Sequence, residues 1–148
     1  METHDAEEEL LVKAIVNIDG ASRGNPGPAS CAAVVSVENA PEMRLGIYLG
    51  TTTNNVAEYS GLILGIAQAL DSGADELQIR SDSNLCVQQV KGAFKVKSEK
   101  LIPLHARVQY LLGKVKSWDI SYVPREQNTA ADSVSNRVLD LQELMARG

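Results

Sequence analysis

The chain has 148 residues, of which 44% are hydrophobic, and a formal net charge of −5 at pH 7. This length suits one domain with one buried core, and no apolar run approaches the ~20 residues that a membrane helix needs. The acidic start of the chain lacks the basic region of a signal peptide. Cys31 and Cys86 each lie in apolar sequence, and with only two histidines beside them no zinc site of ordinary spacing can be written. We therefore expect a cytoplasmic protein with buried free thiols and no membrane segment.

The charges are distributed unevenly along the chain. Residues 1–12 contain five acids and no base, and we expect residues 1–9 to form a flexible acidic tail. Residues 91–116 contain seven bases and one acid. Such a segment is typical either of a solvated helix face or of a surface that binds a polyanion. The negative net charge therefore does not exclude nucleic acid as a partner.

The hydrophobic pattern predicts a single α/β domain over residues 10–148. Three strands are expected first, over residues 12–19, 31–37 and 43–50, and their short connections favour antiparallel pairing. A helix over 56–70 then leads to a strand over 76–82, which we expect to pair in parallel through a right-handed crossover. The remaining elements are predicted as a helix over 83–92, a helix over 103–113, a strand over 118–124 and a final helix from Asn128 or Thr129. The expected architecture is a five-stranded mixed sheet flanked by helices.

Four carboxylates lie where these predicted elements begin or end. Asp19 and Asp82 end strands, whereas Glu58 and Asp132 fall near helix starts. Each has an ordinary structural explanation, as a turn former, a helix cap or a partner of the helix dipole. If the first and fourth strands are neighbours, however, Asp19 and Asp82 meet at one edge of the sheet.

A cluster of four carboxylates without basic partners has to bind protons or cations. An all-oxygen cluster suits Mg²⁺ or Mn²⁺, and two such ions about 4 Å apart can support an in-line displacement at phosphorus. The glycine-rich turn after Asp19, GASRGNPGP, lacks the Lys-Ser/Thr pair of a P-loop. The pattern therefore favours metal-dependent phosphoryl chemistry over nucleotide binding by a P-loop.

Four stretches, taken together and in this order, resemble the type 1 ribonucleases H of the short bacterial and archaeal kind. They are DGASRGNPGPA (19–29), TTTNNVAEYSGL (51–62), SDSNLCVQQVKGAFKVKSEKL (81–101) and VPREQNTAADSVSN (123–136). The resemblance covers about residues 12–140. It implies a ribonuclease H-like fold and an endonuclease that hydrolyses the RNA strand of RNA–DNA hybrids. The products of such an enzyme carry 3′-hydroxyl and 5′-phosphate ends.

The resemblance also implies roles for individual residues. Asp19, Glu58, Asp82 and Asp132 match the metal-binding carboxylates of the family, with Asp19 shared by two ions, Glu58 and Asp82 on one ion, and Asp132 on the other. Further positions match substrate contacts: Asn25, Asn54, Asn55 and Asn84 for the minor groove and its 2′-hydroxyls, Thr53 for a phosphate of the DNA strand, and Phe94, Lys95 and Lys97 in the basic connector. Each Asn or Thr also fits a cap or turn, and Phe94 fits the core equally well.

The sequence departs from the family in two places. Residues 125–131 contain no histidine, although many members have one in the loop before the last carboxylate, and Arg125 or Glu126 is a candidate replacement. The long basic handle of some bacterial members is absent, so we expect modest and salt-dependent affinity for the hybrid. A second candidate function is a module that binds hybrid or double-stranded RNA without cleaving it, and a third possibility is an acidic fold without a site. The complete set of four carboxylates opposes both. We expect a monomer, with double-stranded RNA as an additional candidate substrate.

Overall fold

The computed structural model of the protein describes residues 11–147, so the predicted tail over residues 1–9 lies outside the described part. Five strands form one sheet in the order β3-β2-β1-β4-β5. The first three strands pair antiparallel, β4 pairs in parallel with β1, and β5 pairs in parallel with β4. The strands are β1 (Lys13–Ser22), β2 (Gly27–Val37), β3 (Met43–Thr52), β4 (Glu76–Ser81) and β5 (Ser117–Tyr122). The predicted mixed sheet is confirmed.

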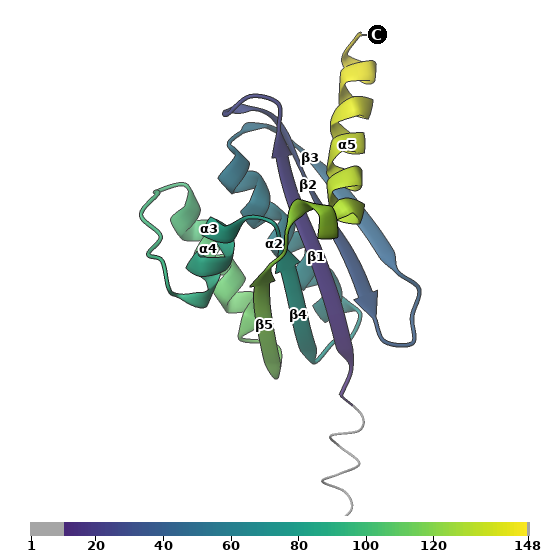
Figure 1. Ribbon diagram of the computed structural model, residues 1–148, viewed down its shortest axis with the longest axis vertical. Coiled ribbons are helices and arrows are strands. Elements are labelled where there is room, and N and C mark those ends of the chain that lie inside the picture. The colour runs from purple at the N-terminus through teal and green to yellow at the C-terminus, as the bar shows by residue number, and fades with distance from the viewer. Residues whose placement is uncertain (1–10, 148) are drawn as a thin grey trace, which may run out of the picture.

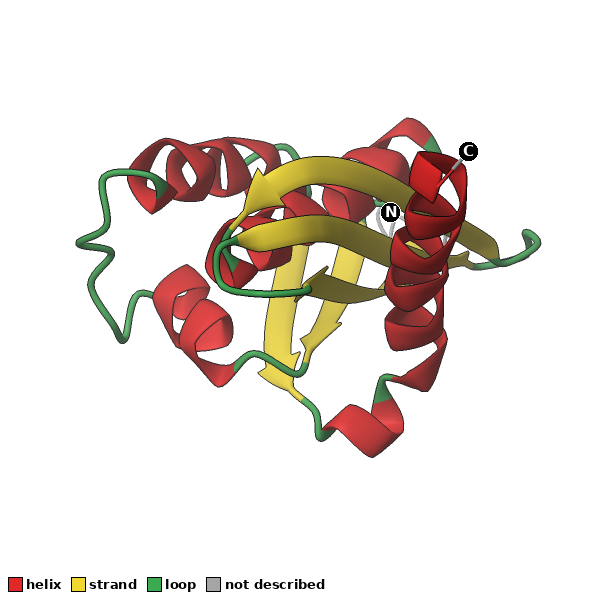
Figure 2. Cartoon of the chain, turned by 90° about the horizontal axis from the view of Figure 1, so that it is seen from above, coloured by secondary structure: helices red, strands yellow, loops and turns green. Residues whose placement is uncertain are grey.

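Helices cover both faces of this sheet (Figures 1 and 2). They are α2 (Asn54–Asp71), α3 (Asn84–Lys91), α4 (Leu101–Leu112) and α5 (Thr129–Arg147), with a 3₁₀ turn η1 (Arg125–Gln127) before the last of them. Alternate residues of a strand point to opposite faces, and β1 shows this directly. Val16 and Ile18 are fully buried in the core shared with α2, whereas Asp19, the next residue, faces α5. Among the helices of the described residues, none is long and apolar enough to cross a membrane.

The first strand is longer than the sequence pattern predicts. We expected it to end at Asp19, but β1 runs on to Ser22, and β2 begins at Gly27 rather than at residue 31. The reason is that Gly20, Ala21 and Ser22 continue the ladder with β2, and only residues 23–26 turn the chain. Asp19 therefore lies inside a paired strand, and its backbone is held on both sides of the carboxylate.

The start of α5 is anchored to the sheet by a buried asparagine. The Asn128 side chain is 1% exposed, donates to the Ile18 carbonyl at 2.8 Å and accepts from Asn17 Nδ2 at 3.1 Å. The Asp132 amide then donates to the Asn128 carbonyl at 3.1 Å, in the first turn of the helix. These bonds fix where α5 begins relative to β1, and so where Asp132 lies relative to Asp19.

Candidate active site

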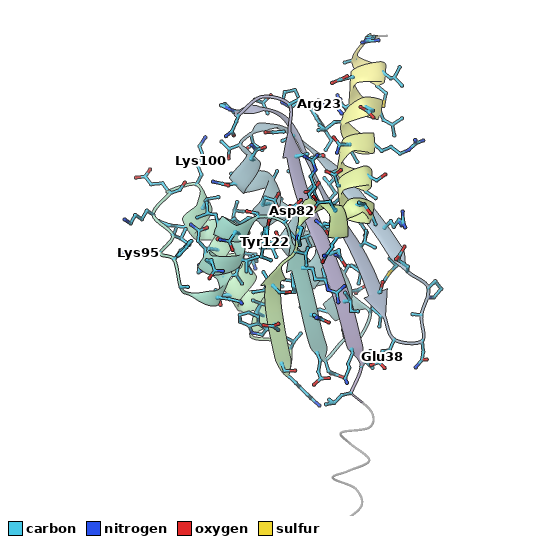
Figure 3. The ribbon with its side chains drawn as sticks, viewed as in Figure 1. Arg23, Glu38, Asp82, Lys95, Lys100 and Tyr122 are labelled. Atoms are coloured by element: carbon cyan, nitrogen blue, oxygen red, sulfur yellow. The ribbon has the colours of Figure 1, made fainter. Side chains whose placement is uncertain are left out.

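A cleft of about 460 Å³ takes in all four predicted carboxylates, Asp19, Glu58, Asp82 and Asp132. Figure 3 shows Asp82 where β4 ends, beside Tyr122 at the end of β5 and close to the start of α5. The rest of the lining consists of Gly20, Ala21, Ser22, Asn54, Tyr122, Arg125 and Asn136. Residues from β1, α2, β5, η1 and α5 thus meet Asp82, which directly follows β4, in one cleft.

Three of the carboxylates form a tight cluster. Asp19, Glu58 and Asp82 each offer one oxygen, and these oxygens lie within 4.8 Å of one another. Asp132 lines the same cleft, but its Oδ1 accepts a hydrogen bond from Arg125 at 3.2 Å and one from Asn136 at 3.2 Å. The cleft therefore contains a group of three carboxylates and, beside it, a fourth that is paired with a guanidinium.

Asp19 is buried and is held by a hydrogen bond from α5. It is 4% exposed, and the Ser135 hydroxyl on α5 donates to its Oδ2. Ser135 is itself fixed, because its carbonyl accepts from Ser30 on β2 at 2.7 Å. One oxygen of Asp19 is thus held by the protein.

Glu58 reaches the cluster because β1 and α2 approach closely. A Cβ atom on Gly20 would lie 2.3 Å from the Glu58 backbone nitrogen, so only glycine allows this spacing. Glu58 is 7% exposed, and its Oε2 is buried without a hydrogen-bond partner among the described residues. A carboxylate oxygen in that position is an available ligand for a cation.

Asp82 is free of the structural role that its position suggested. We considered it as the cap of the next helix, but Ser83 is the N-cap of α3, and its hydroxyl accepts from the Cys86 amide at 3.3 Å. The Ser81 hydroxyl in turn accepts from the Ser83 amide at 3.0 Å. Two serines thus satisfy the backbone around Asp82, and its carboxylate faces the cleft.

The cluster raises the pKa of its own members. Burial, followed by the charges of Asp82 and Asp132, raises the pKa of Asp19 to about 6, although the Ser135 hydrogen bond opposes the shift. Burial, followed by the charges of Asp19 and Asp82, raises the pKa of Glu58 well above its usual value, and burial together with the charge of Asp132 raises the pKa of Asp82. Neighbouring carboxylates with raised pKa values repel one another when they ionise. A divalent cation bound between them would stabilise their ionised forms.

In the metal-free protein we expect the free energy of unfolding to fall as the pH rises from about 4 to 7. Folding raises the pKa of Asp19 from 3.8 to about 6, so this group stabilises the fold below pH 3.8 and the stabilisation is lost as the pH rises through about 6. At about 1.4 kcal/mol per pKa unit, the loss from Asp19 is about 3 kcal/mol. Thermal unfolding in chelator at about pH 3.5 and pH 7.5, on either side of both pKa values, measures it. The Asp19→Asn variant should lose much of the slope, and an equal slope in both proteins would contradict the assignment.

Known proteins resemble this chain in both sequence and structure. The sequence model of the family described as reverse transcriptase-like matches residues 17–138. The crystal structure of RNase H1 from the halophilic archaeon Halobacterium salinarum has a TM-score of 0.82 and 37% sequence identity, over 86% of this chain and 98% of that one. The chain belongs to the type 1 ribonuclease H family.

Other members of the ribonuclease H family extend the comparison. The N-terminal RNase H domain of Rv2228c from Mycobacterium tuberculosis has a TM-score of 0.83 at 40% identity, over 91% of this chain and 99% of that one. LC11-RNase H1, solved in complex with an RNA/DNA hybrid, has a TM-score of 0.77 at 34% identity, over 84% of this chain and 94% of that one. Among curated relatives, the bifunctional protein Rv2228c is 41% identical over 87% of this chain, which spans 36% of that protein. The H. salinarum ribonuclease HI is 41% identical over 82% of this chain, which spans 62% of that protein.

Asn54, which lines the cleft, is hydrogen-bonded to Asn25, another of the amides predicted to contact substrate. Asn25 Oδ1 accepts from the Asn54 amide at 3.0 Å, and the Ser22 hydroxyl donates to Asn54 Oδ1. Thr53 is the N-cap of α2 and accepts from the Val56 amide at 3.3 Å. Ser22 was not among the residues predicted for the site. A serine three residues before the predicted Asn25 was the only sequence signal for it.

Asn54 lines the cleft, whereas the other predicted substrate residues, Asn25 and Thr53 included, do not. Asn55 and Asn84 are exposed at the first turns of α2 and α3. Phe94, Lys95 and Lys97 lie in the connector between α3 and α4, and Figure 3 shows Lys95 on its outer side. Phe94 is 48% exposed, so its interpretation as a core residue is wrong. None of these five residues lies in the lining of the carboxylate cleft, so their roles in substrate binding stay predictions.

The two candidates for the missing family histidine differ sharply. Arg125 lines the cleft and pairs with Asp132, whereas Glu126 is exposed and does not line it. Tyr122, which the sequence did not single out, also lines the cleft and is 50% exposed.

Proposed function

We propose that this protein is an endonuclease that hydrolyses the RNA strand of RNA–DNA hybrids and leaves 3′-hydroxyl and 5′-phosphate ends. One observation supports this most strongly: three carboxylate oxygens lie within 4.8 Å of one another in a cleft that also contains Asp132. The family and the likeness to an RNase H1 solved with an RNA/DNA hybrid support the choice of substrate. The same fold serves other nucleic-acid enzymes, so the substrate itself needs a direct test.

The residues of the cleft fit a pair of divalent cations, Mg²⁺ or Mn²⁺. Two features support this fit: Glu58 Oε2 has no hydrogen-bond partner among residues 11–147, and the pKa values of Asp19 and Asp82 are raised. Asp19 would be shared by both ions, Glu58 and Asp82 would hold one, and Asp132 the other. The ions supply activation of a water and stabilisation of the leaving oxygen in an in-line displacement at phosphorus.

The protein's own residues orient this chemistry. Ser135 fixes one oxygen of Asp19, and Asn128 sets the start of the helix that carries Asp132. Arg125 brings a permanent positive charge beside Asp132, at 3.2 Å. A guanidinium does not release its proton in a protein, so Arg125 cannot transfer a proton as a histidine can. Its role in our proposal is to bind a phosphate oxygen of the substrate and offset charge that develops there.

Replacing Arg125 with Ala should lower kcat for hybrid cleavage by about tenfold, because one positive charge aimed at the phosphate is lost. Glu126→Ala is the matched control, since the neighbouring Glu126 is exposed and does not line the cleft. Single-turnover cleavage at saturating enzyme measures the chemical step. Equal rates for the two variants would remove Arg125 from the mechanism.

The remaining assignments belong to the same proposal. Asn25, Asn54, Asn55 and Asn84 would read the 2′-hydroxyls and minor-groove edges that distinguish RNA from DNA, and Thr53 at the start of α2 would bind a phosphate of the DNA strand. Phe94, Lys95 and Lys97 would contact the DNA strand further along. We also propose that residues 10–148 act as one domain and as a monomer in the cytoplasm, with double-stranded RNA as a further candidate substrate. The buried free thiols of both cysteines support a reducing compartment.

Analysis of the cleavage products tests the proposed chemistry. An end-labelled hybrid is incubated with Mg²⁺, with Mn²⁺ and with chelator, and the RNA fragments are then offered to a polymerase and to a 5′-phosphatase. We expect cleavage only with metal, upstream fragments that the polymerase extends, and downstream fragments that carry a removable phosphate. Cyclic or 3′-phosphate ends, or cleavage in chelator, would contradict the proposal.

A further inference from the structure

The tight loop between β1 and β2 points one long side chain at the last helix. The Arg23 amide donates to the Pro28 carbonyl at 2.8 Å, and a Cβ on Gly27 would lie 2.3 Å from the Arg23 carbonyl oxygen, so the backbone of the loop is closely wound. The guanidinium reaches α5, where it donates to Asp140 Oδ1 and to Glu143 Oε1, both at 2.6 Å. Figure 3 shows Arg23 between the loop and α5.

The helix is the fixed partner in this contact. Ser135 binds Asp19 and Ser30, and a Cβ on Gly46 of β3 would lie 2.7 Å from Val138, so the first half of α5 packs directly on the sheet. Asp140 and Glu143 follow on the same helix. The two ion pairs therefore hold the loop against a helix that is already anchored.

The loop in turn holds the cleft-lining amide of Asn54. Ser22, directly before Arg23, donates through its hydroxyl to Asn54 Oδ1. Asn25, two residues after Arg23, accepts through Oδ1 from the Asn54 backbone nitrogen at 3.0 Å. Asn54 lines the carboxylate cleft. A chain of contacts therefore runs from α5, which carries Asp132, through Arg23 to the amides on the opposite rim.

We propose that Arg23 is a positioning residue for substrate recognition. Its two ion pairs with Asp140 and Glu143 brace the β1–β2 loop against α5, so that Ser22 and Asn25 keep Asn54 aimed at the RNA strand. This inference rests on the proposed function, because the amides it positions are those expected to contact the hybrid. Arg23 itself touches no reacting atom.

A role in positioning differs measurably from a role in stability. Ion pairs with exposed carboxylates contribute little to folding, so Arg23→Ala should shift the melting temperature by no more than about 3 °C. Displacing a binding group by about 1 Å can reduce activity by up to about 10²-fold. We expect Arg23→Ala to raise KM for the hybrid about five- to tenfold and to change kcat less than about twofold.

The test compares four proteins in steady-state cleavage of the hybrid: wild type, Arg23→Ala, a control and a charge swap. The control is Arg44→Ala, because Arg44 pairs with Glu42 at 2.9 Å on the edge strand β3, outside the cleft lining. The swap combines Arg23→Glu with Asp140→Arg and Glu143→Gln. The proposal expects a raised KM for Arg23→Ala alone, a normal KM for the control, and recovery to within about threefold of wild type in the swap. An unchanged KM for Arg23→Ala, or no recovery in the swap, would overturn it.

Hydrogen exchange of the substrate-free proteins gives a second readout that does not depend on catalysis. Peptides covering residues 20–28 and 52–56 should exchange faster in Arg23→Ala than in wild type, and at wild-type rates in Arg44→Ala. Unchanged exchange in both peptides would overturn the brace, whatever the kinetics show. A wild-type protein that leaves the hybrid intact would instead refute the proposed function, and the exchange result would still decide whether Arg23 holds the loop.

Discussion

Replacing Asp19 with Asn is expected to lower the rate of hybrid cleavage about 10³-fold or more while leaving the protein folded. Asp19 is the carboxylate assigned to both ions, and an amide carries no charge to hold either. The Asn oxygen still accepts from the Ser135 hydroxyl, so the local hydrogen bond survives. Burial and the neighbouring acids raise the pKa of Asp19 to about 6, so its ionised form is unfavourable in the metal-free protein. Replacing it with a neutral amide should therefore leave that protein equally or more stable at neutral pH.

Cleavage rates and melting temperatures of the purified variant check both parts of this expectation. Asp119→Asn is the matched control, because Asp119 is an exposed strand aspartate on β5 that does not line the cleft. We expect the control to cleave at the wild-type rate. Retention of near-wild-type cleavage by Asp19→Asn would show that the metal assignment is wrong, and loss of folding would show that the carboxylate has a structural role.

Replacing Gly20 with Ala is expected to have the largest effect on stability. The added Cβ would lie 2.3 Å from the Glu58 nitrogen and 2.4 Å from the Ala57 carbonyl carbon. Both are backbone atoms, so the methyl group can be accommodated only if α2 moves away from β1. We expect a loss of about 3 kcal/mol in the free energy of unfolding. Glu58 would also move away from Asp19 and Asp82, so activity should fall about 10²-fold in the protein that remains folded.

Urea unfolding and cleavage at low temperature separate these two effects. Gly113→Ala is the control, because Gly113 has helical backbone angles with φ −65° and a Cβ there would lie 3.3 Å from its nearest neighbour, the Tyr110 carbonyl oxygen. A stable and active Gly20→Ala protein would mean that β1 and α2 are not locked at this point.

Much of the architecture follows from local sequence patterns. The alternation of β1 and the apolar run of β2 predict a covered sheet, and helical spacing predicts α2 as the crossover to β4. Those two features place Asp19, Glu58 and Asp82 together, because neighbouring parallel strands end at the same edge. The predicted convergence of these carboxylates in one cleft agrees with the structure, and their catalytic roles stay predictions.

The parts that local patterns missed depend on contacts between distant residues. Ser135 and Asp19 are 116 residues apart, and Arg23 and Glu143 are 120 apart. A serine or arginine in isolation gives no sign of such a partner. The error in the predicted end of β1 has a different cause. Gly20, directly after Asp19, favours a turn in the sequence pattern, but the structure needs a glycine there because α2 packs against it.

Cleavage of one labelled sequence offered in four forms tests the central claim most directly. The forms are RNA–DNA hybrid, double-stranded RNA, double-stranded DNA and single-stranded RNA, each with Mg²⁺, with Mn²⁺ and with chelator. We predict metal-dependent cleavage of the RNA strand of the hybrid, much faster than any cleavage of either DNA duplex strand or of single-stranded RNA. Binding of the hybrid without cleavage under every metal condition would contradict this account and would favour a recognition module in which the four carboxylates do not catalyse.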